Sequence, residues 1–193
     1  MIKRNILVVG PGWIGDLIIS ISLIKALKEK NTDANIDILV NSNLYSLAKM
    51  IPGIRNVLSS RTKHGSLSLF YRLCMGYSLR SSGYSECYVL PNSFKSAIIP
   101  FLAGIKKRIS YLGELRYGLI NQIKVPIDRT TGMVNKYLNL ADTNYTEKLK
   151  PEIKLVNIKN ITKKFNLPKK YYVICPDADY GPSKRWPIKK WSD

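Results

Sequence analysis

A short stretch near the amino terminus combines glycines with a carboxylate, in a pattern typical of anion-binding turns. Residues 9–16 read VGPGWIGD and follow a short apolar run. Apolar residues then recur at helical spacing, at Leu17, Ile21, Ile24 and Leu27. A strand, a turn and a helix are therefore expected here. Glycine lets a backbone approach an anion closely, and a helix N-terminus presents unpaired N–H groups.

The glycines alone fit a dinucleotide-binding fingerprint. Gly10, Gly12 and Gly15 match G-x-G-x-x-G. Such a site also needs an acidic residue at the end of the second strand, where it binds ribose hydroxyls. The expected second strand, Asn35 to Val40, runs instead into Asn41-Ser42-Asn43. An NAD-dependent oxidoreductase is therefore disfavoured.

Asp16 is the more informative residue of this stretch, because its charge would repel a pyrophosphate on the same N–H groups. Two roles fit a carboxylate in the first turn of a helix. It can stabilise the helix N-terminus by about 0.3–1 kcal/mol. It can also act as a general base, because open α/β sheets bind ligands at the carboxyl ends of their strands.

The charge balance favours anionic partners. The 193 residues hold 31 Lys and Arg against 13 Asp and Glu, a net charge of +18. Nucleic acid, an anionic membrane and a phosphorylated glycolipid all fit, and so does compositional drift, because the lysines are scattered. No nucleic acid is expected, since the chain lacks RNP-type, zinc-finger and basic amphipathic motifs. A non-catalytic basic module for nucleic acid or membrane remains the alternative to an enzyme.

Cysteine and histidine usage excludes several chemistries. Cys74, Cys87 and Cys175 have neither C-x-x-C nor zinc-ligand spacing, so we expect buried reduced thiols and no metal site. His64 is the only histidine and falls in a basic loop. No apolar run approaches the ~20 residues that span a bilayer. No secretory signal is evident, so a cytoplasmic location is expected.

Strand and helix patterns alternate along the chain, which predicts an α/β fold with a parallel sheet. Strands are expected at 6–9, 35–40, 56–59, 84–90, 106–111 and 171–175, and helices at 17–27, 44–50, 67–81, 97–103, 133–141, 158–165 and from 187. Residues 148–152 resemble a linker. We therefore expect one domain over 1–150, with 151–193 as a linker and the first strand and loop of a second.

Two further segments carry polar groups suited to binding. Residues 91–96 form a second strand-to-helix turn, in which Asn92 or Ser93 is the expected N-cap. Lys95 either projects into the same cleft as Asp16 or is a solvated surface lysine. Arg116 lies in a glycine-containing loop, and its planar fork suits phosphate or carboxylate.

Together these segments resemble glycosyltransferase family 9, which includes ADP-heptose-dependent lipopolysaccharide heptosyltransferases. Four motifs carry the resemblance in order: Gly10-Pro11 with Trp13-Ile14-Gly15-Asp16, residues 90–97 (LPNSFKSA), Arg116-Tyr117-Gly118-Leu119, and Gly181-Pro182 with Lys184-Arg185-Trp186-Pro187. The likeness runs along essentially the whole chain but covers little more than half of a family member. Asp177 and Asp179 depart from it, because the family has Gly and then Glu there.

The resemblance implies the N-terminal lobe of a GT-B enzyme, a Rossmann-like parallel sheet with helices on both faces. It implies an inverting transfer from ADP-heptose to a Kdo-containing lipid A acceptor, without cofactor or obligatory metal. Asp16 matches the catalytic base, and Lys184 with Ser183 matches the donor diphosphate site. Acceptor contacts are implied at Gly12, Trp13, Asn92, Lys95 and Arg116.

The same resemblance implies where the protein works and what this chain lacks. The acceptor's lipid anchor implies peripheral contact with the cytoplasmic face of the inner membrane. Most residues that would hold the donor are expected beyond Asp193. We therefore expect this chain alone to be inactive.

Overall fold

The computed structural model describes residues 4–62, 66–126, 131–143, 152–154, 162–175, 178 and 182–190. The chain forms two compact units, Met1–Lys154 and Leu155–Asp193. The first unit contains every strand assigned in the described residues. His64, Asp177 and Asp179 lie outside the described residues.

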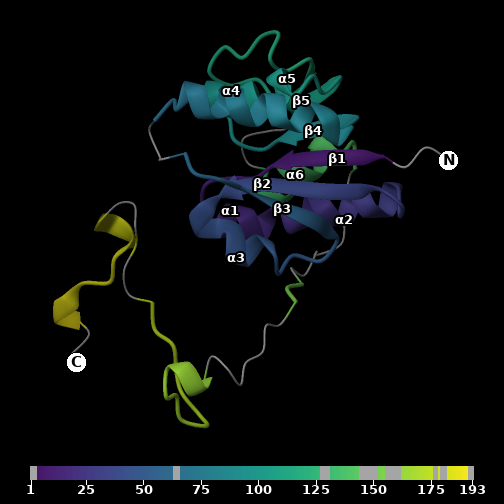
Figure 1. The fold of residues 1–193 in the computed structure, drawn as a ribbon. Coiled ribbons are helices and arrows are strands. Elements are labelled where there is room, and N and C mark those ends of the chain that lie inside the picture. The colour runs from purple at the N-terminus through teal and green to yellow at the C-terminus, as the bar shows by residue number, and fades with distance from the viewer. Residues whose placement is uncertain are drawn as a thin grey trace. The chain divides into compact units, whose positions relative to one another are not determined.

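The first unit is built on one parallel six-stranded sheet (Figure 1). Its strands are β1 (Asn5–Val9), β2 (Asn35–Asn41), β3 (Ile54–Ser60), β4 (Glu86–Val89), β5 (Lys107–Tyr111) and β6 (Gln122–Lys124). Their order is β3-β2-β1-β4-β5-β6, and each neighbouring pair is parallel. This order is that of a Rossmann-like sheet, so the expected fold class is confirmed. The sequence patterns did not predict β6, which is only three residues long.

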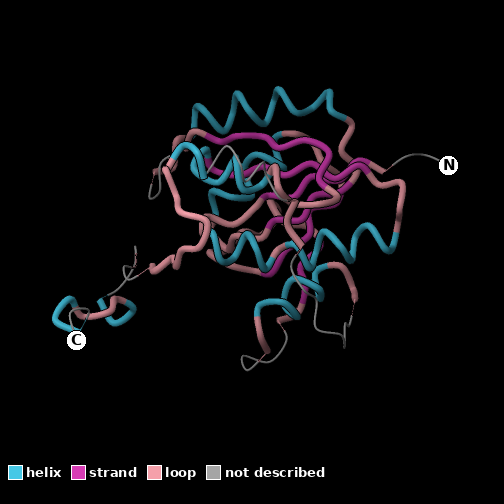
Figure 2. The backbone as a smooth tube through the Cα atoms, turned by 90° about the horizontal axis from the view of Figure 1, so that it is seen from below, coloured by secondary structure: helices cyan, strands magenta, loops and turns pink. Residues whose placement is uncertain are grey.

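Helices cover both faces of the sheet (Figures 1 and 2). They are α1 (Ile14–Ile19), α2 (Ile21–Lys30), α3 (Tyr45–Ala48), α4 (Leu69–Ser78), α5 (Ile98–Leu102) and α6 (Met133–Leu140). Helices α1, α2, α3 and α6 pack on one face, and α4 and α5 pack on the other. No helix in the described part of the chain is long and apolar enough to cross a membrane.

The alternation of side chains along β1 explains the two hydrophobic layers. Ile6 and Val8 belong to the cluster under α1, α2 and α6, whereas Leu7 and Val9 belong to the cluster under α5. Successive residues of a strand point to opposite faces, and β1 is buried on both. This burial fixes the register of β1, so that its carboxyl end leads directly into the glycine turn.

Several expectations about local structure are wrong. The helix expected over 17–27 begins at Ile14 and is divided at Ser20, whose hydroxyl donates to the Leu17 carbonyl at 2.6 Å. Cys87 is buried, but Cys74 and Cys175 are exposed. Cys74 is exposed because α4 buries the side of the helix that carries Arg72 and Gly76 instead.

The second unit lacks the strand expected at 171–175. These residues belong to no strand or helix, and Tyr172 is 98% exposed. A strand needs a neighbour for its hydrogen bonds, and the described residues of this unit contain no other strand. Of the helix expected over 158–165, residues 162–164 are helical and 158–161 lie outside the described residues. The helix expected from residue 187 is a 3₁₀ turn, Ile188–Lys190.

Candidate active site

A cavity of about 510 Å³ lies at the carboxyl ends of the central strands. Its walls come from the turns after β1 and β4, the ends of β2 and β3, Glu114, one residue each of α4 and α5, and two residues of α6. The strand order reverses between β1 and β4, where open α/β sheets bind their ligands. The cavity brings together five of the residues expected in the site, namely Gly12, Trp13, Asp16, Asn92 and Lys95.

The glycines of the first turn differ in what they do. The Gly10 N–H donates to the Leu39 carbonyl at 2.8 Å, and an added Cβ would lie 2.8 Å from Val40 Cγ1. Gly10 is therefore required by the close approach of β2. An added Cβ at Gly12 would meet only Asn41, at 3.9 Å, and one at Gly15 would meet nothing within 4 Å. Of the three fingerprint glycines, only Gly10 is thus required by packing. Gly12 lines the cavity and leaves space there, because it has no side chain.

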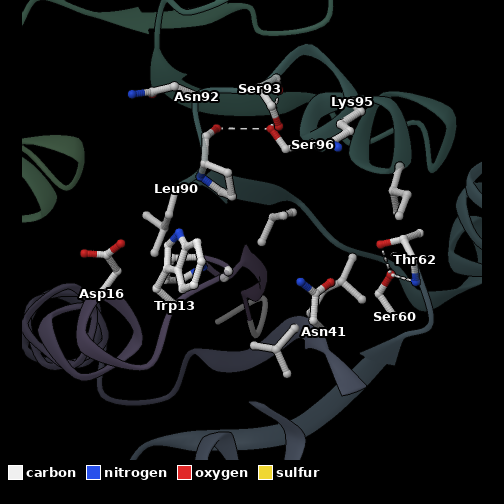
Figure 3. A pocket seen from close by; sticks show the side chains of 18 of the residues that line it. Trp13, Asp16, Asn41, Ser60, Thr62, Leu90, Asn92, Ser93, Lys95 and Ser96 are labelled. Atoms are coloured by element: carbon white, nitrogen blue, oxygen red, sulfur yellow. Dashed lines mark hydrogen bonds between the residues drawn. The ribbon is translucent and has the colours of Figure 1, made fainter. Parts of the chain in front are cut away.

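Asp16 lies in the first turn of α1 and lines the cavity beside Trp13 (Figure 3). Trp13 immediately precedes α1, and its side chain is 44% exposed. Asp16 is half-buried, and no donor among the described residues hydrogen-bonds to its carboxylate. Tyr137 of α6 shares this wall, and burial together with the Asp16 charge raises the pKa of its phenol. The Asp16 carboxylate is therefore open to a polar group of a ligand in the cavity.

The second turn carries Asn92 and Lys95 to the opposite side of the cavity from Asp16 (Figure 3). A 3₁₀ turn, Phe94–Ala97, follows Ser93, which stands at the N-cap without a side-chain capping bond. The prediction of Ser93 as the N-cap residue is therefore confirmed, but its side chain makes no capping bond. The Ser96 hydroxyl contacts the Ser93 carbonyl at 2.5 Å and the Pro91 carbonyl at 3.1 Å instead.

The structure contradicts the expectation that Arg116 contacts a ligand. Its side chain is fully buried and is absent from the cavity wall. Its guanidinium donates to the Pro91 carbonyl at 2.7 Å and to the Tyr111 carbonyl at 2.6 Å. Both are main-chain oxygens within the fold, so the planar fork that suits an anion is used for internal bonds.

Arg72 is a cavity residue that the sequence analysis missed. It is only 7% exposed, lines the cavity, and donates to the main-chain carbonyls of Leu67 at 2.7 Å and Lys95 at 3.0 Å. The signal that could have identified it is the helical spacing of Arg72, Gly76 and Leu79, which are the buried positions here. Polar cavity residues that were also missed are Asn41, Ser60, Thr62, Glu114 and Tyr137.

The expected donor-side residues lie in the second unit. Ser183 and Lys184 are exposed and belong to a 3₁₀ turn, Pro182–Lys184. They line a separate hollow of about 590 Å³ with residues that include Cys175 and Trp186. The described parts of the chain contain no group of three His, Cys, Asp or Glu that could hold a metal ion.

Comparison with known proteins agrees with the fold and the motifs. Residues 72–193 match the model of glycosyltransferase family 9 (heptosyltransferase). The chain is 36% identical to lipopolysaccharide heptosyltransferase 2 of Escherichia coli K12 over 198 residues, which cover 95% of this chain and 57% of that protein. The corresponding protein of Salmonella typhimurium gives the same identity and coverage. The chain thus spans a little over half the length of these relatives.

Solved structures support the same assignment. The structure of E. coli ADP-heptose LPS heptosyltransferase II matches with a TM-score of 0.83 and 33% identity, over 95% of this chain and 58% of that one. E. coli heptosyltransferase WaaC with ADP-2-deoxy-2-fluoro heptose shares the fold, with a TM-score of 0.71 and 14% identity over 97% of this chain and 63% of that one. The fold is therefore that of a GT-B lobe. The chain belongs to glycosyltransferase family 9, the heptosyltransferase family.

Proposed function

We propose that this chain supplies the acceptor-binding half of an inverting heptosyltransferase of lipopolysaccharide inner-core biosynthesis. The donor is ADP-heptose, and the acceptor is heptosyl-Kdo2-lipid A. One observation carries the proposal: Asp16 lines a cavity at the carboxyl ends of β1 and β4, in a chain that belongs to a heptosyltransferase family.

In the proposed reaction the Asp16 carboxylate takes the proton from a hydroxyl of the acceptor heptose. That oxygen attacks the anomeric carbon of ADP-heptose from the face opposite the diphosphate. The new C–O bond forms as the bond to the diphosphate oxygen breaks, and ADP leaves with its electron pair. A general base needs about 2.6–3.2 Å to its hydroxyl, and proton transfer of this kind contributes about 10²–10⁴-fold.

The cavity walls suit the acceptor in this scheme. The exposed indole of Trp13 provides an aromatic face for the apolar side of a sugar ring. Lys95 and Asn92, across the cavity, can bind a Kdo carboxylate or a core phosphate. Gly12 leaves room between them, since nothing but Asn41 lies within 4 Å of a Cβ placed there.

The donor is assigned to the other part of the protein. Residues 1–150 form the acceptor domain in this proposal, and 151–193 form the linker and the opening strand and loop of the nucleotide-sugar domain. The Lys184 ammonium neutralises the charge that develops on the departing diphosphate, and Ser183 donates to it. Because this chain spans little more than half of its relatives, it is not expected to turn over alone.

Membrane contact at the cytoplasmic face of the inner membrane is part of the proposal. The net charge of +18 favours binding to anionic headgroups, which attract basic surfaces by about 1 kcal/mol per Lys or Arg. Flotation with vesicles tests this contact. The protein is expected to float with anionic vesicles and to stay at the bottom with neutral ones, and equal flotation contradicts the electrostatic account.

The decisive experiment compares ADP release by the complete protein and its Asp16→Asn variant, with heptosyl-Kdo2-lipid A as acceptor. Asparagine keeps the shape but cannot take a proton, so kcat is expected to fall about 10³-fold. Asp33→Asn is the control, because Asp33 is an exposed carboxylate remote from the cavity lining. Equal rates for Asp16→Asn and wild type contradict the proposal. Salt-dependent DNA binding without any response to acceptor supports the basic-module alternative instead.

A further inference from the structure

Two buried arginines bond to the turn after β4 from different elements. Arg72 of α4 donates through Nη1 to the Lys95 carbonyl at 3.0 Å. Arg116, from the loop after β5, donates through Nη1 to the Pro91 carbonyl at 2.7 Å and to Ser96 Oγ at 3.1 Å. The two guanidiniums therefore bond to both ends of residues 91–96, the segment that carries Asn92 and Lys95.

Neither arginine is paired with an acid. No carboxylate in the described residues lies within 4.0 Å of either guanidinium, and burial lowers the pKa of both. A buried charge without a counter-ion is costly, so such groups persist only where hydrogen bonds satisfy them. The Nε of Arg116 has no hydrogen-bond partner among the described residues. Ion pairing thus does not explain why arginine occupies these positions.

The planar shape of the guanidinium, rather than its charge, explains why position 116 is an arginine. Its Nη1 bonds to the 91–96 turn, while its Nη2 bonds to Ser110 Oγ at 2.8 Å and to the Tyr111 carbonyl at 2.6 Å. One rigid plane therefore ties the turn to the end of β5. A lysine ammonium is a single point at the end of a flexible stem and cannot join both sides at once.

The loop that carries Arg116 also presses directly on the turn. A Cβ added to Gly113 would lie 2.5 Å from the Asn92 carbonyl oxygen and 2.9 Å from Asn92 Cβ. The next residue, Glu114, accepts a hydrogen bond from the Phe94 N–H at 2.7 Å. The backbone on both sides of Asn92 is therefore held by this loop.

We propose that Arg116 and Arg72 are positioning residues, which fix the 91–96 turn so that Asn92 and Lys95 face the cavity. Neither arginine has to touch the ligand for this role. The consequence for ligand binding rests on the proposed function, in which Asn92 and Lys95 hold the anionic part of the acceptor. The consequence for the turn itself needs no ligand.

The first test measures the turn without ligand, by amide hydrogen exchange of this chain. In Arg116→Lys, exchange at the Ser96 N–H, which donates to the Ser93 carbonyl at 3.1 Å, is expected to rise about tenfold. Exchange at the Gly10 N–H in the first turn is expected to stay unchanged. Arg80→Lys is the control, because Arg80 also donates to a main-chain carbonyl, that of Leu102 at 2.8 Å, which lies in neither turn and outside the loop that carries Arg116. Unchanged protection at Ser96 in Arg116→Lys overturns the proposal.

The second test is a double-mutant cycle in the complete protein, with deacylated heptosyl-Kdo2 oligosaccharide as the probe. Arg116→Lys and Lys95→Ala are each expected to raise the acceptor KM about tenfold, with kcat within about twofold of wild type. If Arg116 acts through the turn, the loss in the double variant is smaller than the product of the two single losses, because the part that Arg116 exerts through Lys95 is already gone. Multiplied effects, or a loss confined to kcat, overturn the positioning role. If Asp16→Asn is fully active, the proposed function fails, but the exchange test still decides the role of Arg116 in the turn.

Discussion

Buried charges are stabilised differently at the two ends of the parallel strands, namely the amino edge, where the strands begin, and the carboxyl edge, where they end. At the amino edge, the buried Asp37 carboxylate accepts from Arg55 Nη2 and from the Tyr84 hydroxyl, each at 2.7 Å. Glu86 lies 3.5 Å from Lys107 at the same edge. At the carboxyl edge, Arg72 and Arg116 bond to carbonyls and hydroxyls instead, with no acid in ion-pair distance among the described residues.

The polar groups of the amino edge therefore stabilise the fold, whereas those of the carboxyl edge are available to bind a ligand. The amino edge neutralises its own charges, so its polar groups contribute to stability whether or not anything binds. The carboxyl edge leaves the positive charge of Arg72 and Lys95 beside an open cavity. A buried guanidinium such as that of Arg72 attracts an anion more strongly than an exposed one, because the local dielectric is lower than that of bulk water.

The largest effect is expected at the amino edge. Asp37→Ala leaves Arg55, the Tyr84 hydroxyl and the Asn56 N–H without their acceptor, and should cost about 3 kcal/mol of unfolding free energy. Urea unfolding of the chain measures it. Asp33→Ala, which removes an exposed carboxylate, should change stability by less than about 0.5 kcal/mol. If both variants lose a similar amount of unfolding free energy, the hydrogen-bonded charges of the amino edge do not contribute specially to stability.

Two glycines at the carboxyl edge, Gly10 and Gly12, are expected to differ in their effects on stability and on ligand binding. Gly10→Ala forces a methyl to 2.8 Å from Val40 Cγ1, and such overpacking costs about 1–3 kcal/mol. Gly12→Ala meets only Asn41, at 3.9 Å, so its cost should stay below about 0.5 kcal/mol. Its methyl should instead weaken acceptor binding, because Gly12 lines the cavity. Thermal unfolding of both variants checks the first claim, and the acceptor KM checks the second.

Acid should weaken the amino edge selectively. Burial by itself raises the pKa of Asp37, but hydrogen bonds from Arg55, Tyr84 and Asn56 and the Arg55 charge outweigh it, so the pKa lies below its ordinary 3.8. A lowered pKa stabilises the fold above the unfolded-state value and loses that contribution as pH falls through the folded-state value. The loss is about 1.4 kcal/mol per unit of depression. Urea unfolding from pH 7 to pH 2 should show this slope in wild type. Asp37→Asn should lack it, and an identical slope in both proteins contradicts the assignment.

A smaller effect on stability than that of Asp37→Ala is expected for Arg72→Met. The variant loses bonds to the Leu67 and Lys95 carbonyls, but it also removes a buried charge that has no acid beside it. A net loss of about 1 kcal/mol is expected, well below that for Asp37→Ala. Differential scanning calorimetry of the two variants compares them directly. A loss as large as that of Asp37→Ala means that the carboxyl edge is as much a stability element as the amino edge.

Local patterns were enough to predict the parts of the site that lie on one element. The spacing of apolar residues after Asp16 predicted a strand-turn-helix unit, and residues 84–103 predicted a second one. Parallel strands end at one edge, so placing Asp16 and Lys95 around a common space followed from the fold class. The roles given to these residues stay predictions.

Local patterns failed where a side chain could turn either way or needed a distant partner. Nothing around Arg116 distinguishes an arginine that faces solvent from one that bonds to Pro91, 25 residues earlier. The strand expected at 171–175 has the right composition, but its existence depends on a neighbouring strand that the described residues of its unit lack.

The sequence by itself determined the alternation of strands and helices, the glycine turn with its carboxylate, and the family to which the chain belongs. The alternation and the glycine turn are local patterns of residue types and spacings, and the family follows from four such patterns in order along the chain, all visible without coordinates. Only the tertiary structure decided that Arg116 is buried and bonds to the Pro91 carbonyl, that Arg72 lines the cavity, and that Tyr84 bonds to Asp37 across 47 residues. The reason is that burial and hydrogen-bond partners are set by which elements pack together.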